Sequence, residues 1–227
     1  MTLDASSGIH RASERTIAMA TTSAPNAAPN VETLSKPLDG LTEAEIRIGF
    51  GGGELAIHRA EPGILLSGTF EDGVTERSAG AGRIQLQPRT VAWPMVVCAP
   101  LHWDVGISAE IPVDLRLDTG ANRSVVDLGA LRIRRLELHT GASETIVHLP
   151  QTGITAVRVE CGFASVTLHV PAGVAALIRG KMAIGATEVD ETRFPREPDG
   201  WRSPDYETAV NRVYLEIDGG FGSVRVA

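Results

Sequence analysis

The chain has 227 residues, of which 43% are hydrophobic and 22% charged, and its formal net charge is −7. This length suits one sizeable folded domain with a tail, and the acidic balance argues against nucleic acid or an anionic membrane surface as a partner. No stretch approaches the ~18 apolar residues of a membrane helix, and the charged N-terminus lacks the apolar run of a secretory signal. We therefore expect a cytoplasmic protein with no direct membrane insertion.

Residues 1–42 form the first distinct segment of the chain. They are rich in Ala, Thr, Ser, Asn and Pro, and residues 21–40 read TTSAPNAAPNVETLSKPLDG. Such a segment buries too little apolar surface to offset the entropy lost on ordering. We expect residues 1–42 to be disordered and residues 43–227 to form a single domain.

From Ala44 onward the pattern changes to short runs in which polar and apolar residues alternate, separated by turns that carry Gly, Asp or Asn. A period of two predicts strands, and no segment has the pattern of an amphipathic helix of normal length. The predicted strands are 46–48, 54–57, 64–70, 83–87, 113–117, 131–138, 145–149, 156–160, 165–170, 214–217 and 223–226. The chain is therefore predicted to be all-β.

A repeat of 21 residues organises these strands. The segments LRLDTGANRS, LELHTGASET and VRVECGFASV begin at Leu115, Leu136 and Val157 and align without a gap. The repeated glycines are Gly120, Gly141 and Gly162; related strand-Gly-strand units contain Gly51 and Gly220, and a looser copy, KMAIGATEV, contains Gly185. A short fixed period is typical of stacked rungs that bury one another's apolar faces. The prediction is a β-solenoid-like stack with rungs of ~21 residues.

Stacking in register makes a prediction about charges, because equivalent residues of adjacent rungs lie one strand spacing apart, ~4.8 Å. One outward column would read Arg116, Glu137, Arg158, and the next would read Asp118, His139, Glu160 and Asp218. Opposite charges that face each other across strands stabilise a sheet, so the alternation favours parallel, in-register stacking. The glycines would supply the corner, through a positive φ or a close backbone approach.

The run Asp118-Thr119-Gly120-Ala121 resembles the catalytic loop of retroviral-type aspartic peptidases, in which two aspartates share a proton. Ala183-Ile184-Gly185 could supply the later apolar-apolar-Gly element of such an enzyme. However, Thr119 matches Thr140 of the next repeat, which indicates repeat chemistry. We expect no catalytic residue, and we keep an aspartic peptidase that uses Asp118 as the alternative.

Other polar candidates have an ordinary structural alternative. Asp127, His148 and His169 would stack in one column, as weak candidates for a divalent metal or as a solvated, pH-sensitive patch. We expect no cofactor.

Three further features are expected to be structural. The run from Gly49 to Glu54 looks more like a Gly-rich turn between strands than a phosphate loop, because no Lys-Ser/Thr ending or helix follows it. Cys98 and Cys161 are expected to be buried thiols. Trp103 is expected in the core, and the charged, Pro-rich loop 190–209 either caps the end of the stack or presents its aromatics to a partner.

With the repeat laid out, residues 44–227 resemble the toastrack-like domain of bacterial LiaF-type and related cell-envelope-stress proteins. The resemblance rests on IRIGFGGGELAI, on Trp103-Asp104-Val105 followed by the three repeats, and on the closing SPDYETAVNRVYLEIDGGFGSVRV. It implies a stacked-strand domain without catalytic residues, whose relatives act beside membrane helices in stress sensing or with signalling partners. We expect a non-enzymatic binding or scaffold module with a protein partner, and self-association through the ends of the stack is a further alternative.

Overall fold

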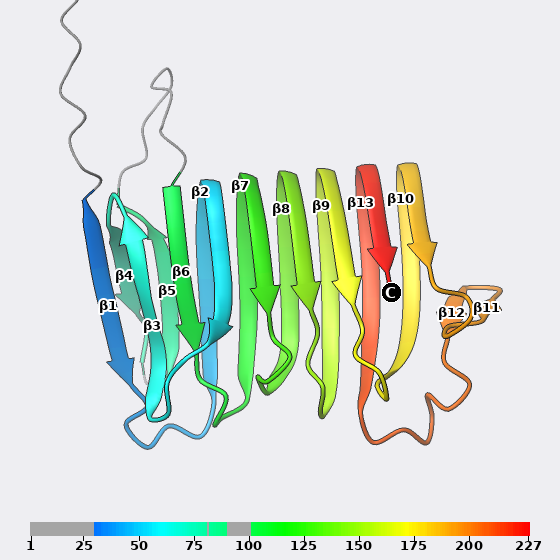
Figure 1. The fold of residues 1–227 in the computed structure, drawn as a ribbon, viewed down its shortest axis with the longest axis horizontal. Helices are drawn as coiled ribbons and strands as arrows, with labels where there is room; N and C mark the ends of the chain where they lie inside the picture. Colours follow the sequence, from blue (N-terminus) through cyan, green and yellow to red (C-terminus); the bar gives the residue numbers. More distant parts are fainter. Residues whose placement is uncertain (1–29, 81, 90–100) are drawn as a thin grey trace, which may run out of the picture.

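The computed structural model describes residues 30–80, 82–89 and 101–227, and within them the chain is all-β (Figure 1). Thirteen strands form one continuous sheet, whose main path runs β1-β3-β6-β2-β7-β8-β9-β13-β10-β12-β11. The strands are β1 (Val31–Pro37), β2 (Ala44–Arg59), β3 (Ile64–Glu71), β4 (Val74–Ser78), β5 (Arg83–Pro88), β6 (Leu101–Ile107), β7 (Val113–Asp127), β8 (Ile133–His148), β9 (Ile154–His169), β10 (Ala175–Val189), β11 (Arg196–Glu197), β12 (Gly200–Arg202) and β13 (Arg212–Val226).

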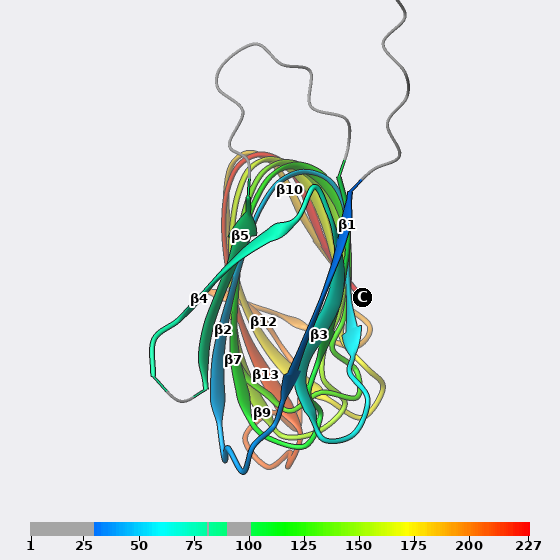
Figure 2. The ribbon, with the colours of Figure 1, turned by 90° about the vertical axis from the view of Figure 1, so that its left-hand side faces the viewer.

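The six long strands β2, β7, β8, β9, β13 and β10 each bend near their middle. Seen along the stack in Figure 2, they arch over at the top and run down both sides, so that each strand contributes to two walls. The predicted pairs of short strands on either side of a repeat glycine are therefore single strands of 15 or 16 residues. β7 and β8 are each followed by a short loop that leads to the next parallel strand, so a bent strand and its loop make one coil and parallel neighbours are joined without helices.

The stack is parallel and in register, as the repeat predicted. Leu115 of β7 pairs with Leu136 of β8, which pairs with Val157 of β9, and the same spacing of 21 residues persists along the strands. The order of the last strands breaks the sequence order, because β13 lies between β9 and β10 and pairs in parallel with both.

The core fills the space between the two walls. Residues of the first wall, such as Leu117 and Leu138, and residues of the second, such as Val126 and Val147, are almost completely buried. Trp103 is 1% exposed, and its ring contacts Phe50 and Phe70, with centroids 5.3 and 4.9 Å away. The prediction that Trp103 belongs to the core is confirmed.

At the N-terminal end of the stack, one rung is divided between two strands. β5 pairs with the first half of β2 and β6 with the second half, so β5 and β6 take the two walls that one bent strand takes elsewhere. β3 and then β1 extend the wall of β6.

The prediction that disorder extends to residue 42 is wrong for Val31–Pro37, which forms β1. Its backbone pairs with β3, Leu34 packs against the core, and Lys36 forms an ion pair of 2.9 Å with Glu76. Residues 1–29, Cys98 and Trp93 lie outside the described residues.

At the other end, the loop 190–209 covers part of the edge of β10. β12 pairs antiparallel with Leu177 and Ile178, and the side chains of Phe194 and Trp201 are 1% and 7% exposed. The loop therefore caps the stack, in line with the first of the two predicted roles. No helix long and apolar enough to cross a membrane occurs in the described ranges.

Candidate functional site

The repeat glycines lie together at the bend, where neighbouring backbones approach closely. A Cβ built on Gly120 would lie 2.2 Å from the carbonyl oxygen of Gly51, and one on Gly141 would lie 3.2 Å from the oxygen of Gly120. Gly162 and Gly220 continue the column, with corresponding distances of 3.3 and 3.1 Å.

Of the two reasons predicted for these glycines, close backbone approach applies. The positive φ values at the bend belong instead to Gly53, Gly185 and Gly222, at 118°, 139° and 129°. Gly49–Glu54, predicted as a turn between strands, is the bend within the single strand β2.

Beside the bend, the outward side chains form the two predicted columns. Arg116 donates to Glu137 over 3.1 Å, and farther along Arg158 lies 3.6 Å from Glu216. In the second column, which we call the polar column, Asp118, His139, Glu160 and Asp218 occupy successive strands. The nitrogen Nδ1 of His139 lies 3.5 Å from Asp118 and 3.9 Å from Glu160, so the histidine separates two carboxylates.

The surroundings of Asp118 differ from those of a peptidase aspartate. Partial burial raises the pKa of this carboxyl, but hydrogen bonds from Arg116 and Arg47 outweigh it and hold the pKa below its ordinary value. A proton-sharing pair needs its second carboxyl about 3 Å away. Asp218 is three strands along the column, about 14 Å at the usual strand spacing. Asp118 is thus held ionised in a ladder, and within the described part of a single chain Asp218 of the same column is too far away to share its proton.

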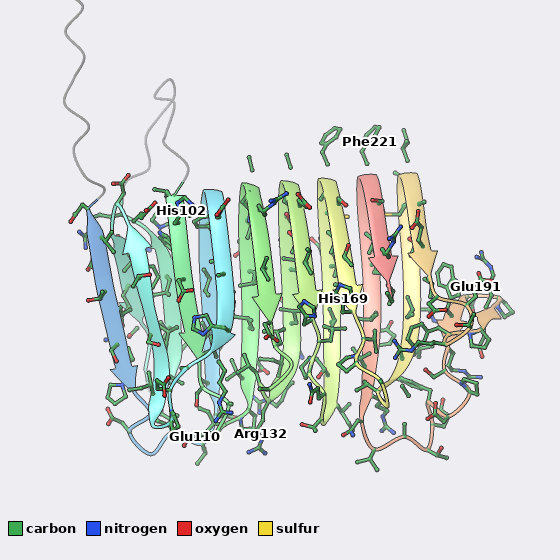
Figure 3. The ribbon with its side chains drawn as sticks, in the orientation of Figure 1. His102, Glu110, Arg132, His169, Glu191 and Phe221 are labelled. Atoms are coloured by element: carbon green, nitrogen blue, oxygen red, sulfur yellow. The ribbon has the colours of Figure 1, made fainter. Side chains whose placement is uncertain are left out.

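Exposed apolar side chains lie on the outer side of the bend. The sequence did not predict this surface. Phe163 of β9, Phe221 of β13 and Ile184 of β10 point outward at the same level, and we call these three side chains the apical ridge (Figure 3). They are 68%, 42% and 59% exposed. The rings of Phe163 and Phe221 stack with centroids 4.8 Å apart and planes inclined by 8°.

A shallow hollow of about 910 Å³ lies beside the apical ridge. Its lining includes all four side chains of the polar column, and also Gly162, Ala183 and Gly220, each of which directly precedes a ridge residue. The apical ridge therefore borders a hollow in which three of the four polar-column side chains are acidic. The sequence signal for the ridge was the Gly-Phe pair at residues 162–163, which recurs at 220–221.

The three weak metal candidates are in one column but do not converge. His148 pairs with Asp127 on one side and His169 on the other, and the two imidazole rings stack face to face at 4.7 Å. Asp127 accepts a hydrogen bond of 3.0 Å from the backbone N–H of Gly129. Over the described parts of the chain, no three His, Cys, Asp or Glu side chains are arranged to hold a metal.

Cys161 is a buried thiol at the inner side of the bend, and burial raises its pKa. A thiol of raised pKa is a weak nucleophile, so this residue is suited to packing and not to covalent chemistry.

Comparison with known proteins identifies the fold. The family model described as the N-terminal domain of toast_rack, DUF2154, matches residues 24–169. No curated protein matches the chain significantly.

Two solved structures illustrate the similarity. A structure from Clostridium sporogenes, provisionally described as a cell adhesion protein, is 18% identical, covers 88% of this chain and 99% of its own, and superposes with a TM-score of 0.76. A Bacteroides fragilis structure, provisionally described as an adhesin, is 9% identical, covers 88% of this chain and 98% of its own, and reaches only 0.38. At 18% identity the first structure supports a shared fold and nothing more. The second superposes too poorly to support even that.

Proposed function

Because the chain belongs to the family of toast_rack N-terminal domains, we propose that it is a non-enzymatic module that binds a protein partner through the apical ridge. Polar side chains close to the bend are already engaged with one another, as Arg116 is with Asp118 and Glu137. The surface at the bend therefore supports binding through the apolar side chains of the apical ridge best.

The observation that carries the proposal is the exposed stack of Phe163 on Phe221. When a partner covers water-exposed aromatic rings, the free energy of the complex falls. Aromatic side chains of this kind dominate the binding energy of many interfaces. The rings support each other and project from a rigid sheet, so little conformational entropy is lost on binding.

The charge beside the apical ridge indicates which kind of surface a partner would present to it. The hollow next to it contains Asp118, Glu160, Asp218 and His139. Asp118 is paired with Arg116 and Arg47, and Glu160 with Arg158, so among the described residues Asp218 is the carboxylate of the hollow left without an ion pair. A matching surface on a partner would have an apolar recess for the rings, edged on one side by Lys or Arg. Lysine and arginine at such an edge would accelerate association and make it sensitive to salt.

We further propose that this partner belongs to a cell-envelope-stress or signalling complex. The support is the resemblance of the strand-Gly-strand units to LiaF-type proteins, which favours this pathway and identifies no residue of the contact.

Cross-linking of the tagged full chain in its native cell, with and without cell-wall stress, followed by mass spectrometry, supplies candidate partners. Each is then purified and its affinity measured against the wild-type chain and the Phe163→Ser/Phe221→Ser variant. Loss of two central aromatics is expected to weaken binding about 30-fold or more. Ile154→Ser is the matched control, because Ile154 is 60% exposed but lies far from the bend, at the start of β9.

Three results would contradict the proposal. The double variant would bind as tightly as the wild type, or Ile154→Ser would weaken binding equally. In the third, light scattering would show wild-type oligomers that the double variant abolishes, which would make the ridge a self-association surface. Enrichment of the partner only under cell-wall stress tests the proposed pathway separately.

A further inference from the structure

A second candidate site lies at the opposite side of β10 from the core, next to the capping loop. It is a cavity of about 570 Å³, enclosed by the first halves of β10 and β13 and by the hairpin that β11 and β12 form. Figure 3 shows side chains gathered around this hairpin, near the labelled Glu191. The volume lies within the range of small-molecule sites. Gly200 brings the hairpin close, since a Cβ there would lie 2.0 Å from the oxygen of Ile178.

The cavity contains a guanidinium that the protein does not satisfy. Nη1 of Arg179 is shielded from solvent and has no hydrogen-bond acceptor among the described residues. Its neighbour across the strands is Glu216, but Glu216 is 3.6 Å from Arg158 on the other side. A buried charged donor without an acceptor costs more than about 1–3 kcal/mol, so Arg179 would be stabilised by turning this nitrogen toward a ligand acceptor in the cavity that it lines.

Two further cations border the same cavity. Lys181 lies opposite Asp218 in the register, yet no carboxylate of the described chain comes within ion-pair distance of it. Arg196 stacks on the ring of Trp201, with its guanidinium carbon 4.9 Å from the centroid. Guanidinium groups bind carboxylate or phosphate through paired N–H donors.

Acidic and aromatic groups complete the lining and restrict the ligand. Asp199, Glu216 and Asp218 are exposed carboxylates that would repel a multiply charged anion but would accept hydrogen bonds from hydroxyl groups. Tyr214, which is 36% exposed, offers an aromatic face to the C–H face of a ring. A neutral polyol would offer Arg179 only uncharged hydroxyl oxygens as acceptors, whereas a carboxylate would also pair with its charge.

From this combination we infer that the cavity binds a small sugar acid, a ring with one carboxylate and several hydroxyl groups. The carboxylate lies against Arg179 and Lys181, the hydroxyl groups donate to the acidic side chains, and the ring covers Tyr214. This site is separate from the apical ridge and does not depend on the function proposed for it.

The test is titration of the full chain with D-glucuronate by calorimetry and by NMR of the labelled protein. D-glucose, which has no carboxylate, acetate, which has no hydroxyl groups, and inorganic phosphate are the matched probes. We expect saturable binding of glucuronate, at least tenfold tighter than any of the three, with NMR shifts at β10, β13 and the β11–β12 hairpin.

Arg179→Gln and, independently, Lys181→Gln should each weaken glucuronate binding about tenfold, and circular dichroism checks that both variants fold. Arg225→Gln is the control, because Arg225 pairs with Glu188 on the second wall. The Phe163→Ser/Phe221→Ser variant should bind glucuronate normally, which separates this inference from the proposed function. The inference is overturned if glucuronate does not saturate, if a probe binds equally well, or if both lining variants bind like the control.

Discussion

Arg116 and Glu137 are 21 residues apart in the sequence and 3.1 Å apart across β7 and β8, where Nη1 of the arginine donates to Oε2 of the glutamate. The pair lies on the outer face of the first wall, and the next two strands continue the alternation with Arg158 and Glu216. A shift of one residue would turn every one of these side chains toward the core. The ladder therefore specifies the register of the stack.

Reversing one charge in this ladder should destabilise the protein. Glu137→Lys places a lysine between Arg116 and Arg158, and we expect the free energy of unfolding to fall by about 1 kcal/mol. The double variant Arg116→Glu/Glu137→Lys should recover part of the loss, but not all of it, since the new glutamate lies beside Asp118. Urea denaturation measures these two variants and the single variant Arg116→Glu, with Glu61→Lys as a surface control. Strictly additive effects in the double-mutant cycle would contradict the pairing.

Asp118 should stabilise the protein at neutral pH and lose this effect in acid. Partial burial raises the pKa of this carboxyl, but the hydrogen bonds from Arg116 and Arg47 hold it below the ordinary value of 3.8. Its contribution is therefore complete above pH 3.8 and is lost as the pH falls through the lower, folded-state value. Asp118→Asn should be less stable than the wild type at pH 7, by about 1 kcal/mol, and the difference should shrink below pH 4.

The same variant tests the peptidase alternative. Neither the wild-type chain nor Asp118→Asn is expected to cleave a denatured protein substrate at pH 4–5, because Arg116 and Arg47 engage Asp118, and Asp218 of its column is too far away to share its proton. Acid-favoured cleavage by the wild type that Asp118→Asn abolishes, with its fold unchanged, would establish the peptidase.

His58 should give the opposite pH dependence. The ring nitrogen Nε2 of His58 donates a hydrogen bond of 2.7 Å to the carboxylate of Asp104, which raises the pKa of His58, with Asp127 adding attraction and burial opposing it. Stability from a raised histidine pKa is complete below the unfolded value of 6.5 and is lost as the pH rises through the folded value. Asp104→Asn should therefore cost a few tenths of a kcal/mol at pH 6 and less at pH 9, since both side chains are about half exposed. NMR titration should show the pKa of His58 falling in the variant; an unchanged pKa would contradict the interaction.

The bend glycines should differ in their tolerance of a methyl group. Gly120→Ala would place a Cβ 2.2 Å from the backbone oxygen of Gly51, and shifting the backbone should cost about 2–3 kcal/mol. Gly141→Ala meets its neighbour at 3.2 Å and should cost less than about 1 kcal/mol. Thermal unfolding measures both. Equal losses would contradict the close approach as the reason for glycine at these two positions.

The stack could be predicted from the sequence because each rung repeats the same chemistry. Gly120, Gly141 and Gly162 gave the period, and the signs of Arg116 and Glu137 gave the parallel register. The position of β13 could not be predicted in this way, since its column pattern fits next to any other rung. β1 was missed because its seven residues pack chiefly through Leu34, which leaves too weak a pattern beside a polar segment.

The candidate sites were less predictable than the fold. A phenylalanine in a strand is normally assigned to the core. Phe163 points outward because it lies at the bend of β9, which the sequence pattern does not show. The cavity around Arg179 needs residues from β10, from β13 and from the capping hairpin between them, which meet only when the hairpin folds back onto β10 and the two long strands pair. Only the tertiary arrangement brings those groups together.

The insertion of β13 between β9 and β10 has a consequence for the order of folding. β10 leaves the ribosome before β13, so at that moment its final neighbour does not yet exist. Rungs up to β9 can add one after another as they are synthesised, whereas β10 and its capping hairpin must wait or detach until β13 arrives. The last step is therefore the insertion of β13 between β9 and β10. We expect residues 170–226 to fold as one cooperative unit.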